Sequence, residues 1–189
     1  MPHSIYYLPG YGGRLSTGLG EALHSRGYDI AGRETVGEFK SLPFQEQVAV
    51  VGQDLTSLYW HADARVIANS FGAYLFLHAQ AQTAPYIGRV LLLSPIVGEF
   101  SNEETLMNFI PPRSGRLQEL AQSGKYPIPK HCEIHVGEHD WQSIPQDVVA
   151  LAGLLGLKVT VVPGAGHMLG KGYVGAVLDV WLDGKYDGT

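Results

Sequence analysis

A serine in the middle of the chain has the neighbours that a serine nucleophile requires. Ser70 lies between a short β-rich run and a helical pattern, in the segment Ala68-Asn69-Ser70-Phe71-Gly72. A strand, a sharp turn and a helix are the setting of the G-x-S-x-G nucleophile elbow, in which small residues two positions before and after the serine avoid a clash across the turn. Ala68 replaces the first glycine, so the match is partial. Ser70 is predicted to be a nucleophile; the alternative is a serine that only caps the helix.

A histidine towards the end of the chain is placed to serve as the base. A serine hydroxyl is too weakly acidic to attack an ester unaided, so it needs a base within hydrogen-bond reach and a third group that holds this base in the right tautomer. His167 follows the apolar run Lys158–Val162 and the turn Gly164-Ala165-Gly166, before a helical pattern. We predict that His167 is the base. A surface-loop histidine is the alternative, because the chain contains eight histidines.

The acid that orients the histidine is expected after the preceding strand. Asp140 lies in the loop that follows the apolar run Cys132–Val136, and Glu138 and Asp147 are competing carboxylates nearby. The resulting order of nucleophile, acid and histidine along the chain is the order found in hydrolases that carry a nucleophile elbow. Asp140 is therefore the predicted acid.

A glycine-rich loop after the first apolar run is predicted to stabilise negative charge on the substrate. The tetrahedral intermediate of acyl transfer needs two preorganised N–H donors. The amide of Phe71, directly after the serine, is one predicted donor, and the amide of Tyr11 in the loop Pro9–Gly13 is the other. Gly10 is predicted to contact the substrate, because glycine lets the backbone approach the serine. A phosphate-binding loop is excluded because Leu15 stands where G-x-G-x-x-G requires glycine.

A metal site is the rival hypothesis. His131, Glu133 and His135 alternate along one apolar run and would point to the same face of a strand, a spacing that can supply metal ligands. Polar side chains near the start of such a strand more often meet loop backbone or solvent than a metal, because helices cover both faces of the sheet. The expectation is that the protein uses no metal and no cofactor.

The predicted functional residues follow apolar runs that alternate with helical patterns. This alternation predicts an α/β protein, a three-layer α/β/α sandwich with a mostly or wholly parallel six-stranded sheet. In such a sheet the functional groups gather at the carboxyl ends of the strands. The predicted strands are Ser4–Leu8, Tyr28–Ala31, Arg65–Ala68, Arg89–Leu93, Cys132–Val136 and Lys158–Val162, and the predicted helices are Leu15–Arg26, Phe44–Tyr59, Phe71–Gln82, Val148–Leu155 and Tyr173–Leu182.

One long connection interrupts the alternation. No strand is predicted between Pro95 and Pro129, although a helix is expected at Arg116–Gln122. A connection of this length usually has a function or covers something. We interpret residues 97–127 as a short lid-like insertion. Its apolar residues Leu106, Met107 and Phe109 are predicted to line the substrate pocket.

Length and charge restrict the function further. The 189 residues, 45% of them hydrophobic, suffice for a single domain spanning 1–189. A net charge of −5 without a basic stripe argues against a nucleic-acid partner, and no apolar stretch is long enough to predict a membrane span. The single cysteine, Cys132, fits a reducing compartment, so a cytoplasmic location is expected. The oligomeric state is left open.

Together these motifs resemble the α/β-hydrolase superfamily, and within it the small, nearly cap-less serine hydrolases of the retinoblastoma-binding-protein type. The resemblance extends from Tyr7 to about Leu182. The family usually carries His-Gly in the first motif and glycine at the first elbow position, where this chain has Pro9 and Ala68. The resemblance implies that the first two strands of the larger fold are absent and that the strand order is 2-1-3-4-5-6. It rests on Leu8–Gly13, Asn69–Gly72, Asp140 followed by Ile144-Pro145, and Gly164–His167.

The expected function is therefore that of a serine hydrolase that forms an acyl-enzyme, acting on small carboxylic esters. Thioesters and amides would use the same residues, and the sequence does not separate them. The expected partner is a small-molecule acyl substrate. A binding protein that retains the fold without turnover is the alternative from another functional class.

Overall fold

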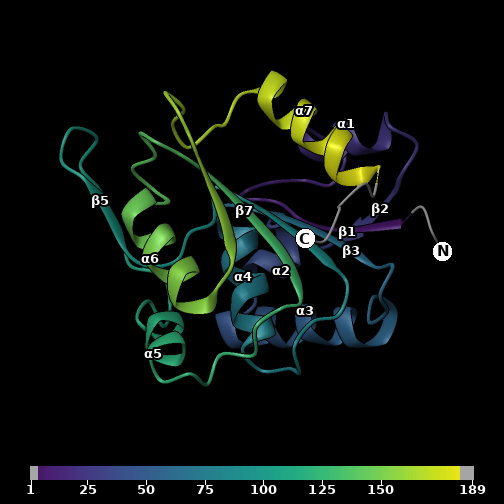
Figure 1. The fold of residues 1–189 in the computed structure, drawn as a ribbon, viewed down its shortest axis with the longest axis horizontal. Helices are drawn as coiled ribbons and strands as arrows, with labels where there is room; N and C mark the ends of the chain where they lie inside the picture. The colour runs from purple at the N-terminus through teal and green to yellow at the C-terminus, as the bar shows by residue number, and fades with distance from the viewer. Residues whose placement is uncertain (1–3, 184–189) are drawn as a thin grey trace.

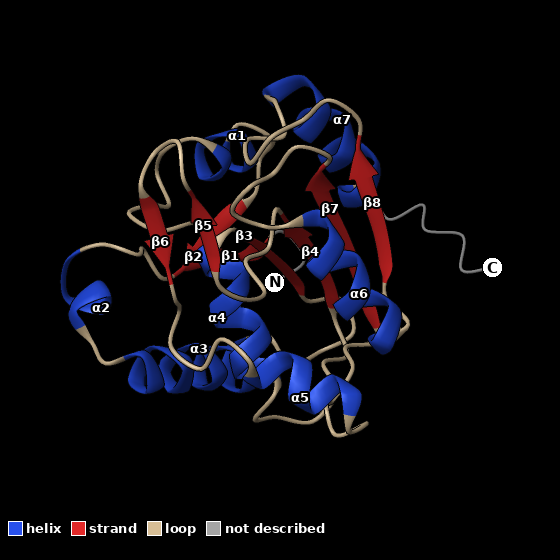
Figure 2. Ribbon diagram, turned by 90° about the vertical axis from the view of Figure 1, so that its left-hand side faces the viewer, coloured by secondary structure: helices blue, strands red, loops and turns tan. Residues whose placement is uncertain are grey.

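Six parallel strands form the central sheet of the protein. The computed structural model describes residues 4–183, and its sheet has the order β2-β1-β3-β4-β7-β8 (Figures 1 and 2). The predicted fold class and the predicted strand order 2-1-3-4-5-6 are thus confirmed. The strands of this sheet are β1 (Ser4–Leu8), β2 (Asp29–Gly32), β3 (Arg65–Asn69), β4 (Arg89–Leu93), β7 (His131–Gly137) and β8 (Lys158–Val162).

Helices cover both faces of the sheet and form the two outer layers. In Figure 2, α1 and α7 lie on one face, and α3, α4, α5 and α6 lie on the other. The short helix α2 has no buried residue. Among the described residues no helix is both long and apolar enough to cross a membrane. The helices are α1 (Leu19–His24), α2 (Gly37–Ser41), α3 (Phe44–Leu58), α4 (Phe71–Gln80), α5 (Arg116–Gln122), α6 (Pro145–Leu155) and α7 (Lys171–Leu182).

Alternation along the strands divides the core into two hydrophobic clusters. On β1, Tyr6 and Leu8 join the cluster on the α3 and α4 side, whereas Ile5 and Tyr7 join the cluster under α1 and α7. Both clusters are buried because a parallel sheet with helices on both faces exposes neither face to water. The central strands β1, β3 and β4 are therefore apolar on both sides, which explains why they read as nearly continuous apolar runs in the sequence.

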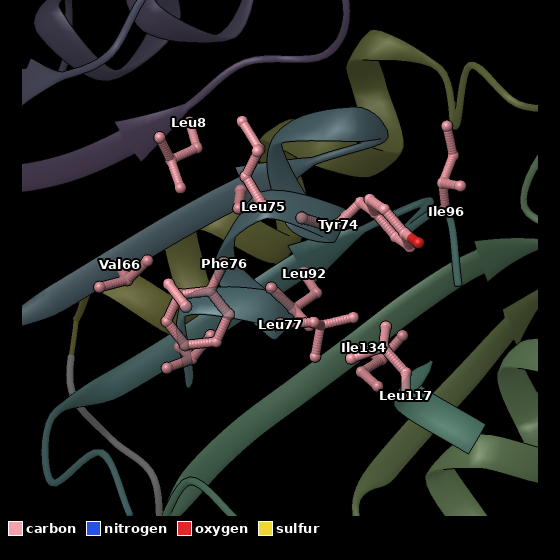
Figure 3. Packing of buried hydrophobic residues seen from close by; sticks show 14 of the residues in the cluster. Leu8, Val66, Tyr74, Leu75, Phe76, Leu77, Leu92, Ile96, Leu117 and Ile134 are labelled. Carbon is pink, nitrogen blue, oxygen red and sulfur yellow. The ribbon is translucent and has the colours of Figure 1, made fainter. Parts of the chain in front are cut away.

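Helix α4 is the most deeply buried helix of the fold. All ten of its residues are buried, and Figure 3 shows side chains from Tyr74 to Leu77 packed among residues of the sheet, such as Leu92 and Ile134. A helix that is apolar on all sides belongs in a core. Because Ser70 immediately precedes this helix, its backbone is attached to a rigid part of the protein.

The interval predicted to lack strands contains a β-hairpin, so this prediction was wrong. Strands β5 (Phe100–Asn102) and β6 (Met107–Phe109) pair antiparallel and form a separate two-stranded sheet (Figure 2). The Asn102 side chain accepts a hydrogen bond from the Thr105 amide at 3.0 Å and shapes the turn. Strands of three residues are too short to give a recognisable alternation. The rings of Phe100 and Phe109 contact each other across the hairpin and add to its backbone pairing.

The predicted helices differ from the observed ones mainly at their first turns. Helix α1 begins at Leu19 instead of Leu15, because Gly18 before it has a φ of 59° that interrupts the helical path. Helix α6 begins at Pro145, three residues earlier than predicted, since proline is well suited to the first position of a helix. Helix α2 was not predicted at all. It is a five-residue helix without a buried face, so it leaves no apolar periodicity in the sequence.

Candidate active site

Ser70 occupies a strained turn between β3 and α4. Its φ of 51° and ψ of −121° lie in a region that non-glycine residues rarely adopt. The turn is tight enough that a Cβ on Gly72 would lie 2.2 Å from the Leu8 carbonyl oxygen, so glycine is required there. The Ser70 amide donates to the Leu93 carbonyl at 3.0 Å, which fixes the turn to the end of β4. Strain of this kind persists only where the surroundings enforce it, and it is common at reactive residues.

The imidazole of His167 lies directly beside the serine hydroxyl. Its Nε2 atom is 2.9 Å from Ser70 Oγ. His167 belongs to the loop between β8 and α7, and its backbone is held by the Ser94 hydroxyl, which donates to the His167 carbonyl at 2.9 Å. Two loops at the carboxyl edge of the sheet therefore bring together residues that are 97 positions apart in sequence.

The carboxylate of Asp140 contacts the other ring nitrogen of His167. The distances from Nδ1 to the two carboxylate oxygens are 2.9 and 3.0 Å. Asp140 is only 3% exposed, and the amides of Gln142 and Ser143 donate to its Oδ1 atom at 2.9 and 2.8 Å. Burial by itself would raise the pKa of the Asp140 carboxyl. The pKa of Asp140 is nevertheless held below its ordinary value. The ionised carboxylate accepts hydrogen bonds from His167 and the two amides and is attracted electrostatically to His167, and together these effects outweigh burial.

The competing carboxylates have other partners. The Oε2 atom of Glu138 accepts the Gly164 amide at 2.8 Å, on a side chain that is half exposed. Asp147 belongs to the first turn of α6. Of the three carboxylates weighed from the sequence, Asp140 is thus the one that contacts His167.

These contacts define the protonation pattern of the cluster. An ionised Asp140 only accepts hydrogen bonds, so the proton of a neutral His167 ring is assigned to Nδ1. The lone pair on Nε2 then faces the hydroxyl of Ser70 and can accept its proton. This arrangement can convert a weakly nucleophilic hydroxyl into an attacking oxygen.

The loop after β1 approaches the nucleophile closely at Gly10. A Cβ on Gly10 would lie 3.1 Å from Ser70 Cβ and 3.5 Å from Ser70 Oγ, so a larger residue would occupy the space beside the hydroxyl. Phe71 is the first residue of α4, and its amide has no acceptor within the helix. Among the described residues no carbonyl or side chain accepts from the amides of Phe71 or Tyr11. Both predicted oxyanion donors are therefore without an acceptor in the described part of the protein, and their role stays a prediction.

Aromatic rings form a wall beside the nucleophile. The Phe71 ring contacts the rings of Tyr11 and Phe109 edge-on, at centroid distances of 5.6 and 6.4 Å. Phe109 packs on Phe100, which in turn contacts Trp141. Phe100 and Trp141 were not predicted from the sequence; the position of Trp141 directly after the predicted acid was the signal that could have identified it.

The other two lid residues predicted to line the pocket are placed differently from Phe109. Leu106 lies in the turn of the hairpin and is 91% exposed, so it does not line a pocket in this structure. Met107 lies next to it and is 48% exposed. Alternation places Met107 and Phe109 on the same face of β6. They differ in position along the strand, because Met107 pairs with Asn102 beside the turn, whereas Phe109 pairs with Phe100 and its ring contacts that of Phe71.

Two of the three residues of the rival metal hypothesis, Glu133 and His135, belong to a hydrogen-bonded cluster with Tyr173. The ring nitrogens of His135 contact the Tyr173 hydroxyl at 2.7 Å and the Glu133 carboxylate at 2.8 Å. His131 is exposed at the start of β7. Within residues 4–183 no three histidine, cysteine or acidic side chains are grouped so as to hold a metal ion.

Comparison with known proteins shows which solved structures have a similar fold. No protein-family model and no curated protein sequence matches the chain. Among solved structures, it is similar to alpha/beta hydrolase domain-containing protein 10 from mouse, with a TM-score of 0.67 at 14% identity over 95% of this chain and 89% of that one. It is also similar to the ydeN gene product of B. subtilis, with a TM-score of 0.65 at 14% identity over 95% of this chain and 98% of that one.

A third similar structure is carboxylesterase CesB (YbfK) from Bacillus subtilis, with a TM-score of 0.63 at 16% identity over 95% of this chain and 83% of that one. Identities this low show a shared fold and do not carry activity from one protein to another. The chain has the α/β-hydrolase fold. The finer resemblance to the retinoblastoma-binding-protein type stays a prediction.

Proposed function

From this fold and the contacts around Ser70, we propose that the protein is a serine hydrolase that cleaves small carboxylic esters through an acyl-enzyme. The observation that carries the proposal is the continuous chain of contacts from Ser70 Oγ to His167 Nε2 and from His167 Nδ1 to Asp140, each close to 2.9 Å. Ser70 also lies on a strained turn at the N-terminus of α4. A serine that only capped its helix would require neither the histidine nor the buried carboxylate.

The proposed reaction has two steps. Ser70 Oγ attacks the ester carbonyl while His167 Nε2 takes its proton, and His167 then returns that proton to the departing alcohol. Water attacks the resulting acyl-enzyme with the same histidine as base, which releases the acid and restores the serine. In both steps the oxyanion rests on the amides of Tyr11 and Phe71, and Asp140 stabilises the imidazolium that forms.

The proposed substrates are small because the walls beside Ser70 are short. The hairpin β5–β6 has only three residues in each strand, and of its side chains Phe109 is the one that meets Phe71. Each enclosed methylene contributes about 0.8 kcal/mol only while apolar walls still surround it. We therefore propose short-chain acyl esters as substrates, with aromatic contacts to Phe71 and Phe109.

Covalent labelling tests the proposal directly. A fluorophosphonate probe should modify Ser70 stoichiometrically, with loss of fluoride, and a peptide map should locate the adduct. The Ser70→Ala variant should remain unlabelled. Ser57→Ala provides the matched control, because Ser57 is exposed on α3 and takes part in none of the contacts described for Ser70, His167 and Asp140. This variant should label like the wild type. A folded wild-type protein that stays unlabelled would favour the alternative, a binding protein without turnover.

A further inference from the structure

Thr35 binds the glycine-rich loop through its hydroxyl, which acts both as a hydrogen-bond donor and as an acceptor. It lies between β2 and α2 and is 2% exposed. Its hydroxyl donates a hydrogen bond to the carbonyl of Gly10 and accepts one from the amide of Gly13 at 2.9 Å. Donor and acceptor capacities of the hydroxyl are thus both used on a single loop.

The backbone of Thr35 adds two further bonds to the same loop. Its amide donates to the Gly13 carbonyl at 3.1 Å, and its carbonyl accepts from the Gly12 amide at 3.2 Å. The amide of Gly13 also reaches the Gly10 carbonyl at 2.9 Å, which closes the turn. Of the three amides in residues 11–13, those of Gly12 and Gly13 are therefore occupied, and that of Tyr11 has no acceptor among the described residues.

This loop needs an external restraint. Three of its residues are glycines, which have more conformational freedom than any other residue, and Gly12 has a φ of 77°. An oxyanion donor contributes only if it is already oriented before the charge develops, since reorientation during the reaction would consume the gain. Thr35 is the buried side chain that bridges the two ends of this turn.

The geometry points to Thr35 as a positioning residue that fixes the loop 10–13 by binding the Gly12 and Gly13 segment, which leaves the Tyr11 amide to face the oxyanion beside Ser70. The inference rests on the proposed function, and it adds to that function a residue outside the predicted site. Thr35 itself touches no reacting atom. Its contribution should therefore appear in the rate of turnover and not in substrate affinity.

Kinetics of two substitutions at this position test the inference. Thr35→Val keeps the shape and removes both hydroxyl bonds, and it should lower kcat for p-nitrophenyl acetate by about 10- to 100-fold, less than the loss of a whole donor, with KM changed less than about 3-fold. Thr35→Ser retains the hydroxyl and should stay within about 3-fold of the wild-type kcat. A loss of activity in both variants, a change confined to KM, or no change in Thr35→Val would overturn the inference.

A second variant separates positioning from general destabilisation. Tyr86→Phe also removes a buried hydrogen bond, the one from the Tyr86 hydroxyl to the Tyr59 carbonyl at 2.7 Å, but it lies in the α3 and α4 side of the core. This control should lower the thermal transition and leave kcat unchanged. If Tyr86→Phe lowered kcat as strongly as Thr35→Val, the effect would be one of stability, and the inference would be wrong.

Amide hydrogen exchange gives a readout that does not depend on activity. In the wild type the Gly12 and Gly13 amides should be protected and the Tyr11 amide should exchange quickly; in Thr35→Val the protection of Gly12 and Gly13 should fall at least about 10-fold. If the amides exchange in this way but the fluorophosphonate probe does not label Ser70, the proposed function and the catalytic role of Thr35 are both refuted. The conclusion that Thr35 restrains the loop 10–13 would still stand. Unprotected Gly12 and Gly13 amides in the wild type would refute the restraint even in an active enzyme.

Discussion

Acidification should destabilise the protein through one buried histidine, His78, in the middle of α4. The residue is 3% exposed, and its ring contacts the rings of Phe44 and Tyr74. Its Nε2 atom is buried without a hydrogen-bond partner. Burial, with a smaller contribution from the positive charges of Arg113 and Arg116, lowers the pKa of His78 from 6.5 to about 4.

The sign and the size of the effect follow from this shift. Between pH 6.5 and about 4 the unfolded chain binds a proton at His78 and the folded protein does not. Stability therefore rises with pH across this window and is lost as the pH falls through it. At about 1.36 kcal/mol per pH unit, the difference between the pKa values of His78 in the unfolded and folded states lowers the free energy of unfolding by up to about 3 kcal/mol on acidification to pH 4. Below the folded pKa the contribution of His78 becomes constant.

Urea unfolding at a series of pH values measures this contribution. His78→Phe keeps an aromatic ring and removes the titrating group, so its free energy of unfolding should fall by about 3 kcal/mol less than that of the wild type between pH 6.5 and 4. His61→Gln, which changes an exposed histidine, should retain the wild-type slope. Equal slopes in the wild type and His78→Phe would refute the reasoning, because the folded protein would then accommodate the charge at His78.

Three further predictions concern catalysis. Ser70→Ala and His167→Ala should each lower kcat for an activated ester by at least about 1000-fold with little change in melting temperature, and the double variant should be no worse than either; a single variant retaining a tenth of the activity would contradict this. Asp140→Asn should lose at least about 100-fold in kcat while Glu138→Gln stays near the wild type, and steady-state kinetics showing the reverse would reassign the acid. For p-nitrophenyl esters, kcat/KM should be highest between acetate and hexanoate, and a steady rise to palmitate would refute the small pocket.

Much of the fold could be predicted because its signals are local. Each strand of the main sheet contains at least four residues and most of them are apolar runs, and the helical patterns between the strands predict a parallel sheet. The hairpin escaped prediction because its strands of three residues are too short to show an alternation, and the contact between Phe100 and Phe109 joins residues nine positions apart. The start of α1 was misplaced because the backbone angle of Gly18 is not visible in composition.

The sequence by itself determined which residue types follow which strand, and thereby that Ser70, His167 and one of three carboxylates belong to the same edge of the sheet. Only the tertiary structure decided that the carboxylate in contact with His167 is that of Asp140, at 2.9 Å from Nδ1, and that Leu106 lies exposed on a turn. No sequence motif identified Thr35. Its proposed role depends on the register between β1 and β2, which brings a buried hydroxyl into contact with a loop 25 residues earlier in the chain. Chain order and local backbone preference are properties of a segment, whereas such contacts arise only when distant segments pack at a particular register.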